Sequence, residues 1–483
     1  MSQNEMFRLL MSLLVGGLFS WVIYSSAYNQ EPADSSIRRT RFDPFIDPMY
    51  LTDVLAGVIG LWLILGWADG RLILSVCLGI AIETCVYYGV LLPLLPLLRK
   101  VFRPSTVAAL WLLPNVLYFT LYSYMRPSEP KSVLSVPIDA PIWLLAVWGA
   151  GFLFVLGRAI ARHLAYRHEL LRDAISVTDS EILEIWDREK ANIGWNKVEM
   201  TPLYSPAAVT PLSIGVWRKT TRILLPRQKY TPEELRLIFR HELIHTCHRD
   251  GSAKLFLTLC QAVFWFNPLM WIAMRKCADD LELSCDELAL ADADANTRET
   301  YARLILRTAG DERGFTSCLS VRAKALRYRL QGIVAPRARL VGGLLAGLLI
   351  AALLLTNGMV AVAYAPATGE DVIFSDQSAD YTPTSIALRN KGAFVFSPLT
   401  CTDSPAFHRY LADLTLCHIT GIYDPRGDNL LVTMNGESLS VSLYEHLVVV
   451  EDWDGHQLQK SRLYYSPEPL DLDYLMTLME EKT

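Results

Sequence analysis

Residues 231–250 read Thr-Pro-Glu-Glu-Leu-Arg-Leu-Ile-Phe-Arg-His-Glu-Leu-Ile-His-Thr-Cys-His-Arg-Asp. The opening of this stretch predicts the start of a helix. Thr231 is a favoured cap, Pro232 suits the first turn, and Glu234 can complete a capping box with the threonine. The apolar spacing that follows predicts a helix over Thr231–His248. Because cap and periodicity agree, we expect this helix to organise the central part of the chain.

The helix carries a His-Glu-x-x-His motif at His241-Glu242-Leu243-Ile244-His245. Positions i and i+4 share a helix face, so both imidazoles can bind one zinc ion at ~2.0–2.1 Å. Glu242 lies beside them, where a carboxylate can act as catalytic base and take a proton from the attacking water. The alternative is an ordinary amphipathic helix whose two histidines only make hydrogen bonds.

A catalytic zinc site needs a third protein ligand, and residues 279–286 provide a candidate. Glu282 and Asp286 are four residues apart and share one helix face. Glu282 is predicted to bind the metal, and Asp286 to accept the free N–H of a ligand histidine. A solvated acidic face is the alternative. Cys285 is expected to point away from the face of Glu282.

Three polar residues follow the motif at the end of the helix. His248 partly shares the face of His245, but helix geometry favours a surface or supporting role over coordination. Arg249 and Asp250 are expected to tie the helix end to its neighbours. Asp250 therefore belongs, with Asp286, to the predicted surroundings of the metal.

The apolar stretch Leu255–Met274 separates the two motifs. A single membrane crossing here would put His245 and Glu282 on opposite sides of the bilayer, where they could not share a metal. Asn267-Pro268 breaks the helix in the middle. The stretch is therefore predicted to form two short helices, either at the cytoplasmic membrane face or as a buried hairpin of a soluble core.

Two further elements are predicted before the motif. Helical periodicity covers Asp179–Ile193, and Ile214–Leu225 is rich in residues that favour a strand or hairpin. An exposed edge in the region Ile214–Pro226 could pair with a substrate as an additional strand. The central region 159–339 is thus expected to be a mostly helical domain.

The apolar residues gather in long blocks. Of 483 residues, 52% are apolar and 20% charged, which predicts membrane-spanning helices. The blocks are 7–27, 53–68, 72–98, 105–125, 141–158 and 340–364, and 53–68 is short for a span. The first block is expected to be a retained anchor. Glu83 lies inside the third block, where a hydrogen-bonded or protonated helix contact is favoured over a functional site.

Basic residues predict the orientation, because they concentrate on the cytoplasmic side. They place the N-terminus outside, 159–339 in the cytoplasm and the tail outside. The residues used are Arg38, Arg39, Arg41, Arg99, Lys100, Arg103, Arg158, Arg162, Arg167, Arg172, Arg322, Lys324, Arg327, Arg329, Arg337 and Arg339. The net charge of −5 is too small to indicate direct binding of nucleic acid.

The tail 365–483 differs from the rest of the chain. It holds 18 Asp and Glu against 7 Lys and Arg, consistent with an exterior position. Alternating residues flank the turns Asn435-Gly436 and Asp454-Gly455, which predicts a small antiparallel β domain. Cys401 and Cys417 could pair if the tail is outside. The other cysteines are expected to be free thiols.

Several stretches together resemble the BlaR/MecR family of membrane metallopeptidases, roughly over 141–340. They are Pro211–Pro226, His241–His245, Arg249-Asp250, Trp265–Pro268, Trp271 and Glu282–Asp286. The resemblance implies a gluzincin-like cytoplasmic domain with one zinc ion on His241, His245 and Glu282, and Glu242 as base. It also implies that an external signal activates cleavage of the protein itself and loss of a BlaI/MecI-like DNA-bound repressor.

The tail departs from the β-lactam sensors of that family. It is about half the size of their penicillin-binding domain or less and contains no Ser-x-x-Lys. We therefore predict a mostly helical polytopic membrane protein that is a signal-transducing zinc metalloprotease. The alternatives are a β-lactam sensor proper and a catalytically silent receptor. The predicted partners are a cytoplasmic protein substrate and the lipid bilayer, and a homodimer is left open.

Overall fold

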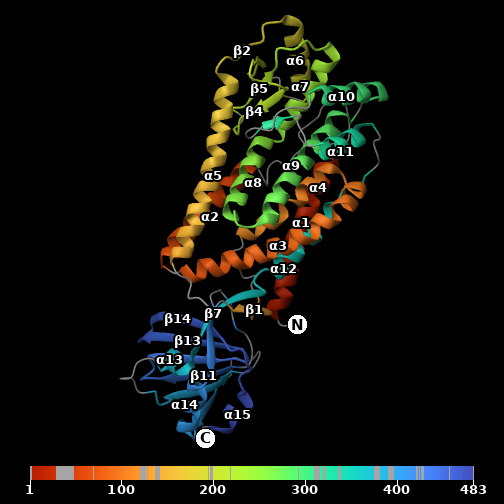
Figure 1. Ribbon diagram of the computed structural model, residues 1–483. Helices are drawn as coiled ribbons and strands as arrows, with labels where there is room; N and C mark the ends of the chain where they lie inside the picture. Colours follow the sequence, from red (N-terminus) through yellow and green to blue (C-terminus); the bar gives the residue numbers. More distant parts are fainter. Residues whose placement is uncertain are drawn as a thin grey trace.

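The chain is elongated, with three tiers (Figure 1). A mixed α/β region lies at one end, long helices form the middle, and a β-rich region forms the other end. The computed structural model describes residues 3–481 except 29–47, 69, 120–126, 128, 136–141, 194, 196–198, 218, 292, 309–315, 319–322, 335–338, 375–380, 390–395, 420–422, 424, 426–428 and 456. Arg38, Arg39, Arg41, Arg322 and Arg337, used above for orientation, lie outside the described residues.

The helices are α1 (Gln3–Tyr28), α2 (Pro48–Ala68), α3 (Gly70–Val101), α4 (Pro104–Leu110), the 3-10 helix η1 (Leu113–Phe119), α5 (Ile142–Leu171), α6 (Ser180–Asn192), α7 (Pro232–Cys247), α8 (Asp250–Val263), α9 (Pro268–Ala289), α10 (Ala295–Thr308), α11 (Ala323–Val334), α12 (Gly343–Thr356), α13 (Gly369–Ile373), α14 (Ser404–Ala412) and α15 (Leu472–Thr477). The strands are β1 (Ser132–Ser135), β2 (Ile175–Ser176), β3 (Leu203–Tyr204), β4 (Leu212–Ile214), β5 (Arg222–Leu225), β6 (Thr316–Cys318), β7 (Val360–Thr368), β8 (Ser385–Arg389), β9 (Phe396–Cys401), β10 (Thr415–Ile419), β11 (Asn429–Met434), β12 (Leu439–Leu443), β13 (Leu447–Asp454), β14 (Gln457–Tyr465) and β15 (Met479–Glu481).

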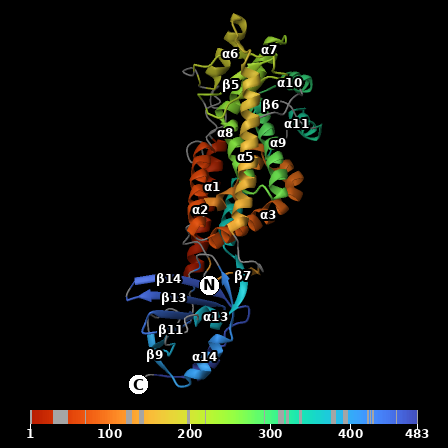
Figure 2. The same ribbon diagram turned by 60° about the vertical axis from the view of Figure 1, so that its left-hand side comes forward.

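Two described helices are long and apolar enough to cross a membrane. They are the segments Glu5–Ser25 of α1 and Cys77–Val101 of α3. Apolar stretches of α2 and α12 are shorter, at Thr52–Leu61 and Gly343–Thr356. Helix α5 starts in the predicted block 141–158 but continues to Leu171 and reaches the α/β region; it follows the left edge in Figure 1 and lies in front in Figure 2.

The described part of the block 105–125, residues 105–119, does not form the single helix that its composition predicted. Helix α4 has 7 residues and ends at Leu110, and a 3-10 helix of 7 residues follows. Pro114 lies in that second segment, and a proline lacks the N–H that an α-helical ladder needs. Trp111 and Leu117 are fully buried, so this segment packs inside the bundle.

The block 340–364 is likewise only partly helical. Helix α12 has 14 residues, about 21 Å, and strand β7 starts at Val360. The helix ends at Asn357, whose ψ of 126° is outside the helical region, and Gly358 follows in a left-handed conformation with φ +78°. Helices α1 and α12 cross closely at Gly16 and Gly347, where an added Cβ would lie 2.3–2.4 Å from the partner's carbonyl oxygen.

The predicted elements before the metal motif form as expected. Asp179 caps α6, and Thr231 caps α7 through a capping box with Glu234. The region 214–225 is a hairpin in which β4 pairs antiparallel with β5. The sheet of this domain has the order β2-β3-β5-β4-β6. Its helices α6 and α7 share a buried apolar core that includes Trp186 and Phe239.

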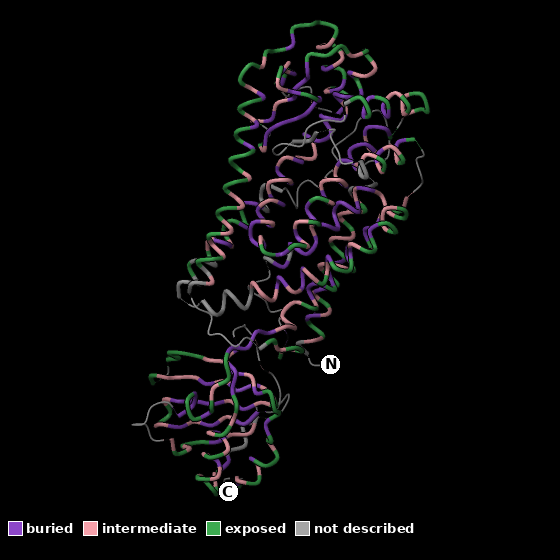
Figure 3. The backbone as a smooth tube through the Cα atoms, in the orientation of Figure 1, coloured by how far each residue is buried: buried purple, intermediate pink, exposed green. Residues whose placement is uncertain are grey.

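The apolar stretch between the motifs is two helices, as predicted. Helix α8 ends at Val263, and α9 begins at Pro268 with Asn267 as its cap. Phe256 and Met270 belong to the same buried cluster as residues of α2, α3, α4 and α12. This stretch therefore packs into the core of the helical tier, seen as the buried centre of the trace in Figure 3.

The tail forms the predicted β domain. Its sheet has the order β1-β7-β10-β14-β13-β12-β11-β8-β9-β15. The hairpins at Asn435-Gly436 and Asp454-Gly455 are present, and each of these glycines has a positive φ. The sheet departs from the prediction in one pairing, because β1 and β7 are parallel. Cys401 and Cys417 are free thiols.

The helical tier and the sheet of the tail meet at the start of β7. Strand β1 comes from the loop between the N-terminal helices, yet it pairs with Val360–Ala363 of β7. Glu83 of α3 accepts a hydrogen bond from the Gly358 N–H at 3.3 Å. Tyr423 donates to the Gly358 carbonyl at 3.1 Å. Glu83 thus makes the hydrogen-bonded contact that was favoured for it, and its partner is backbone at this junction.

Candidate metal centre

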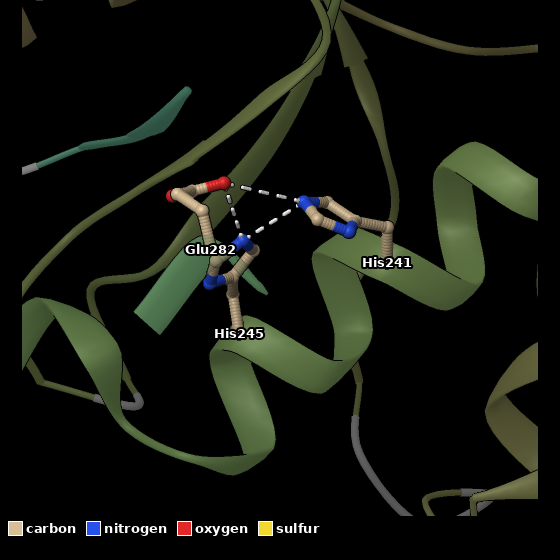
Figure 4. A group of neighbouring side chains, drawn as sticks. All are labelled: His241, His245 and Glu282. Carbon is tan, nitrogen blue, oxygen red and sulfur yellow. Dashed lines mark hydrogen bonds and ion pairs between the residues drawn. The ribbon is translucent and has the colours of Figure 1, made fainter. Parts of the chain in front are cut away.

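Two helices bring three predicted ligands together. His241 and His245 lie on α7 and Glu282 on α9, and all three are buried (Figure 4). The two Nε2 atoms are 2.9 Å apart. Glu282 Oε2 lies 3.7 Å from Nε2 of His241 and 3.5 Å from Nε2 of His245. One atom from each residue lies within 4.8 Å of the others, a spacing that suits a single metal ion.

Asp250 determines the tautomer of His245. Its Oδ2 lies 2.5 Å from His245 Nδ1. An ionised carboxylate only accepts hydrogen bonds, so Nδ1 donates and the lone pair is on Nε2. The sequence predicted that Asp250 ties the end of the helix to its neighbours. Its partner is the imidazole of His245. Asp250 reaches this ring because Arg249 adopts a left-handed conformation (φ 56°) that turns the chain back.

Tyr301 of α10 performs the same task for His241. Its hydroxyl lies 2.8 Å from His241 Nδ1 and donates to Asp286 Oδ1 at 2.7 Å. Burial and the adjacent Asp286 raise the pKa of Tyr301 well above its usual value, so the hydroxyl keeps its proton. His241 Nδ1 must therefore donate, which leaves its Nε2 lone pair available. Asp286, predicted to accept the free N–H of a ligand histidine, lies 3.5 Å from His241 Nδ1 and is also linked to it through Tyr301.

The resulting arrangement suits a cation. Two ring lone pairs face each other and a carboxylate oxygen lies beside both, so like partial charges converge unless a positive charge separates them. Glu282 Oε2 is buried and has no hydrogen-bond partner among the described residues. Two imidazoles and one carboxylate are a ligand set of catalytic zinc sites, which keep a further position open. The residues present therefore fit a divalent metal.

Charge interactions within the cluster match this view. Burial disfavours a charged His245, yet the Cys285 sulfur and the carboxylates of Glu282 and Asp250 outweigh it and raise the pKa of His245 well above its usual range. Burial alone would raise the pKa of Glu282, but the two histidines hold it well below its usual value. The cluster thus favours positive charge on its nitrogen side and keeps Glu282 ionised.

Glu242 is fully buried next to the two ligand histidines. Burial raises its pKa, which His241 and His245 oppose. Its side chain also makes a hydrogen bond with Ser213 of β4. A carboxylate with a raised pKa is a stronger proton acceptor at neutral pH.

Arg329 of α11 is a residue of the site that sequence reasoning missed. It was taken as one of the basic residues flanking the membrane, but it is only 1% exposed. Its Nε and Nη2 donate to Asp286 at 2.6 Å, and Nη1 lies 3.4 Å from Glu282 Oε2. Two carboxylates of α9 compensate its charge, which is why it can be buried.

Cys285 and His248 lie close to the candidate ligands along the chain, and Cys285 contacts one of them. Cys285 does not point away: its Sγ lies 3.3 Å from His245 Nδ1 and 3.5 Å from Asp250 Oδ2. Positions 282 and 285 are i and i+3, which also share a helix face. His248 caps the C-terminus of α7, half-buried and outside the cluster of candidate ligands.

Comparisons with known proteins agree with this arrangement. Residues 131–333 match the family described as BlaR1 peptidase M56. The regulatory protein BlaR1 of Bacillus licheniformis is 26% identical over 186 residues, which cover 38% of this chain and 30% of that protein. The methicillin resistance mecR1 protein of Staphylococcus aureus is 25% identical over 167 residues, 34% of this chain and 28% of that protein.

The region 131–333 of this chain is thus of the BlaR/MecR type. The family region contains α7, α8 and α9, and hence every residue of the candidate centre from His241 to Arg329. The match spans less than a third of either relative's own length. The β-rich tail lies outside the matched family region.

Proposed function

We propose that this chain is a membrane zinc metalloendopeptidase, with His241, His245 and Glu282 as ligands of one zinc ion and Glu242 as catalytic base. The observation that carries the proposal is the convergence of two imidazole lone pairs on one carboxylate, next to a second buried carboxylate. Membership of a peptidase family supports the same conclusion.

In the proposed mechanism, Glu242 transfers the proton, and Asp250, Tyr301 and Arg329 position the metal ligands. A bound zinc ion would act as a Lewis acid toward the scissile carbonyl and make water nucleophilic near neutral pH. Glu242 takes the proton of the attacking water and returns it to the leaving amine. Asp250 and Tyr301 hold the two imidazoles in the tautomer that presents Nε2. Arg329 keeps Asp286 and Glu282 in place.

The domain arrangement is part of the proposal. An N-terminal bundle (1–158), a cytoplasmic peptidase domain (159–339), a membrane helix within 340–364 and an outer β domain (365–483) form one polytopic protein. The pairing of β1 with β7 supports this, since it places the loop before α5 and the tail at the same end. The N-terminus lies near that end too (Figure 1).

The substrate is proposed to be a cytoplasmic protein: a BlaI/MecI-like repressor, this chain itself, or both, cleaved in response to an external signal. One pairing favours self-cleavage. Strand β6 adds antiparallel to the edge of β4, with Ser213 opposite Ser317. Substrate pairing was predicted at this edge, and Ser213 also contacts Glu242. A segment of the chain thus occupies a position where an extended peptide would be held near the base.

The test compares purified full-length wild type with Glu242→Gln. Zinc per chain is measured by mass spectrometry of the metal, and cleavage by sequencing new N-termini. We expect one zinc in both proteins and a loss of cleavage of at least about 10²-fold in the variant. Glu184→Gln, an exposed change on α6, is the control and should cleave normally. Zinc binding without any cleavage by wild type would favour a silent receptor, and cleavage by Glu242→Gln would refute the assigned base.

A further inference from the structure

A second cavity lies on the other side of helices α9 and α11 from the metal centre. Its volume is about 820 Å³, and it is bounded by the end of α3, the start of α4, α9 and α11. In Figure 1, α3 crosses the molecule, and one of its ends meets α4 on the side where α9 and α11 lie. Asp280, Tyr328 and Arg339 line this cavity, whereas Glu282 and Arg329 face the metal centre. The proposed peptidase chemistry makes no use of it.

The lining is strongly basic. Four cationic side chains, those of Arg99, Lys100, Arg327 and Arg339, line the cavity, and Asp280 is the single acidic residue among its lining residues. Asp280 is fully buried and already accepts hydrogen bonds from Arg99 Nε at 2.8 Å and Trp111 Nε1 at 2.7 Å. Outside the lining, Glu287 lies 3.9 Å from Arg339 Nη1. Two carboxylates cannot balance four cations, so the cavity has a net positive charge.

Several donors in the cavity have no partner among the described residues. Arg99 Nη2 and Arg339 Nε are buried without a hydrogen bond. The guanidinium of Arg99 is held over the ring of Tyr328, 5.2 Å from its centroid, so its free edge is fixed. Lys100 and Arg327 are exposed and make no ion pair with a described residue. Fixed guanidinium donors match the geometry of phosphate oxygens.

Apolar surface continues from this basic cavity. Leu94, Leu97 and Val101 are 44%, 58% and 36% exposed, and their spacing along α3 places them on one helix face. Val334, which lines the cavity from α11, is 66% exposed, and Leu340, whose N–H donates to the Val101 carbonyl at 2.9 Å, is 64% exposed. A ligand that fills the cavity and also covers these residues must have an anionic end and an apolar end.

We propose that this cavity binds the phosphate headgroup of an anionic phospholipid, with an acyl chain along the exposed face of α3. Basic pockets between membrane helices near the cytoplasmic surface recognise such headgroups by charge. In the proposed orientation, Arg99 and Lys100 lie where α3 leaves the bilayer on that side. The proposal rests on that orientation and is independent of peptidase activity.

The position of the cavity gives the lipid a structural role. Tyr328 and Arg329 are consecutive on α11, the first lining the cavity and the second bound to Asp286. Asp280 and Glu282 are similarly close on α9. Arg99 of α3 is bound to Asp280 of α9, and Arg327 lies on α11. A headgroup bound by both arginines therefore links α11 to α9, the two helices that hold the metal ligand Glu282 and its partner Arg329.

The test measures lipid binding to the full-length protein in detergent by native mass spectrometry, with phosphatidylglycerol and phosphatidylcholine as probes. The variant Lys100→Gln/Arg327→Gln removes two exposed cations without breaking a buried ion pair. It should weaken binding of phosphatidylglycerol by roughly 30-fold and leave phosphatidylcholine unchanged. The control Arg158→Gln/Arg162→Gln removes two exposed cations of α5. It should bind phosphatidylglycerol like wild type.

Three results would overturn the proposal. The first is equal affinity of wild type for the two lipids. The second is an equal loss of phosphatidylglycerol in both double variants, which would show a general surface attraction. The third comes from inorganic phosphate added without lipid: if it stabilises wild type and displaces phosphatidylglycerol, and Lys100→Gln/Arg327→Gln abolishes both effects, the cavity is a site for a soluble phosphate and not for a lipid.

Discussion

Arg329 shows how the candidate centre depends on single buried charges. Its guanidinium compensates Asp286 through two hydrogen bonds and lies against Glu282, with almost no access to water. Removing one partner of such a buried pair leaves the other charge uncompensated, which costs more than the pair contributes. Arg329 thus supports the charge balance of the site although it is not itself a candidate metal ligand.

Replacing Arg329 with methionine should lower the free energy of unfolding by about 3–5 kcal/mol, because Asp286 would stay buried without its counter-charge. Chemical denaturation of the full-length protein in detergent measures this. Arg327→Met is the matched control: it changes an exposed residue of the same helix and should cost less than about 0.5 kcal/mol. Equal stability of the two variants would contradict the assigned role.

Zinc should stabilise the protein more as pH rises. The raised pKa of His245 means that its charged form stabilises the metal-free protein, fully below the usual histidine pKa of about 6.5 and less as pH rises through the raised value. A metal needs the neutral imidazole, so protons compete with it. The melting temperature is measured with and without zinc at several pH values from below about 6.5 upward. The increase in melting temperature caused by zinc should become larger as the pH rises.

The control for this pH dependence is His168→Gln, an exposed substitution on α5 that should leave the trend unchanged. A zinc-induced shift in melting temperature that stays constant or shrinks as pH rises would contradict the proposed competition at His245.

The sequence predicted the residues of the site that carry a local signature. His241, Glu242 and His245 share one short motif, and Glu282 and Asp286 repeat its i, i+4 spacing. Tyr301 and Arg329 had no such signal, because they lie 60 and 43 residues from their partners along the chain. Only the packing of α10 and α11 against α7 and α9 brings them to the site.

At the scale of elements, local signals predicted the helices that have strong caps. Thr231 and Asn267 start α7 and α9 where expected, because side-chain caps and prolines act within one turn. Apolar composition was a weaker guide. It predicted single helices for 105–125 and 340–364, although Pro114 and Gly358 lie in them. An apolar composition indicates that a segment is buried. A buried strand or a short buried helix has the same composition as a membrane-spanning helix.

The close crossing of α1 and α12 provides a prediction at this scale. Gly347→Leu should push the helices apart, since an added Cβ already meets the Gly16 carbonyl at 2.4 Å, and should cost about 1–3 kcal/mol. Thermal unfolding in detergent measures the loss. Gly17→Leu is the matched control on the adjacent position, where an added Cβ meets nothing within 4 Å. Equal destabilisation by both changes would mean that this crossing is not tightly packed.

At the scale of the whole molecule, the α/β region and the outer sheet lie at opposite ends of the helical tier in both views (Figures 1 and 2). This separation agrees with the proposal that one end faces the cytoplasm and the other the exterior. The distribution of charge predicted this orientation, but nothing in the sequence indicated that β1 joins the distant tail.

Reporter fusions test that orientation. Alkaline phosphatase is active only outside the cytoplasm, so it should be active behind the last residue and inactive behind Asn192. Green fluorescent protein at the same two positions serves as the reciprocal control and should fluoresce only behind Asn192. Phosphatase activity behind Asn192 would place the peptidase region outside and would rule out a cytoplasmic substrate.

The junction between α12 and β7 has a mechanical consequence. Only Asn357–Met359 separate the helix from a strand that is hydrogen-bonded on both sides, and Glu83 holds Gly358 from α3. A linkage this short allows little independent motion, so the sheet of the tail and the helices should move together as one rigid unit. We expect a torque on that sheet to rotate α12, and α1 with it, and not to be lost in a loose tether.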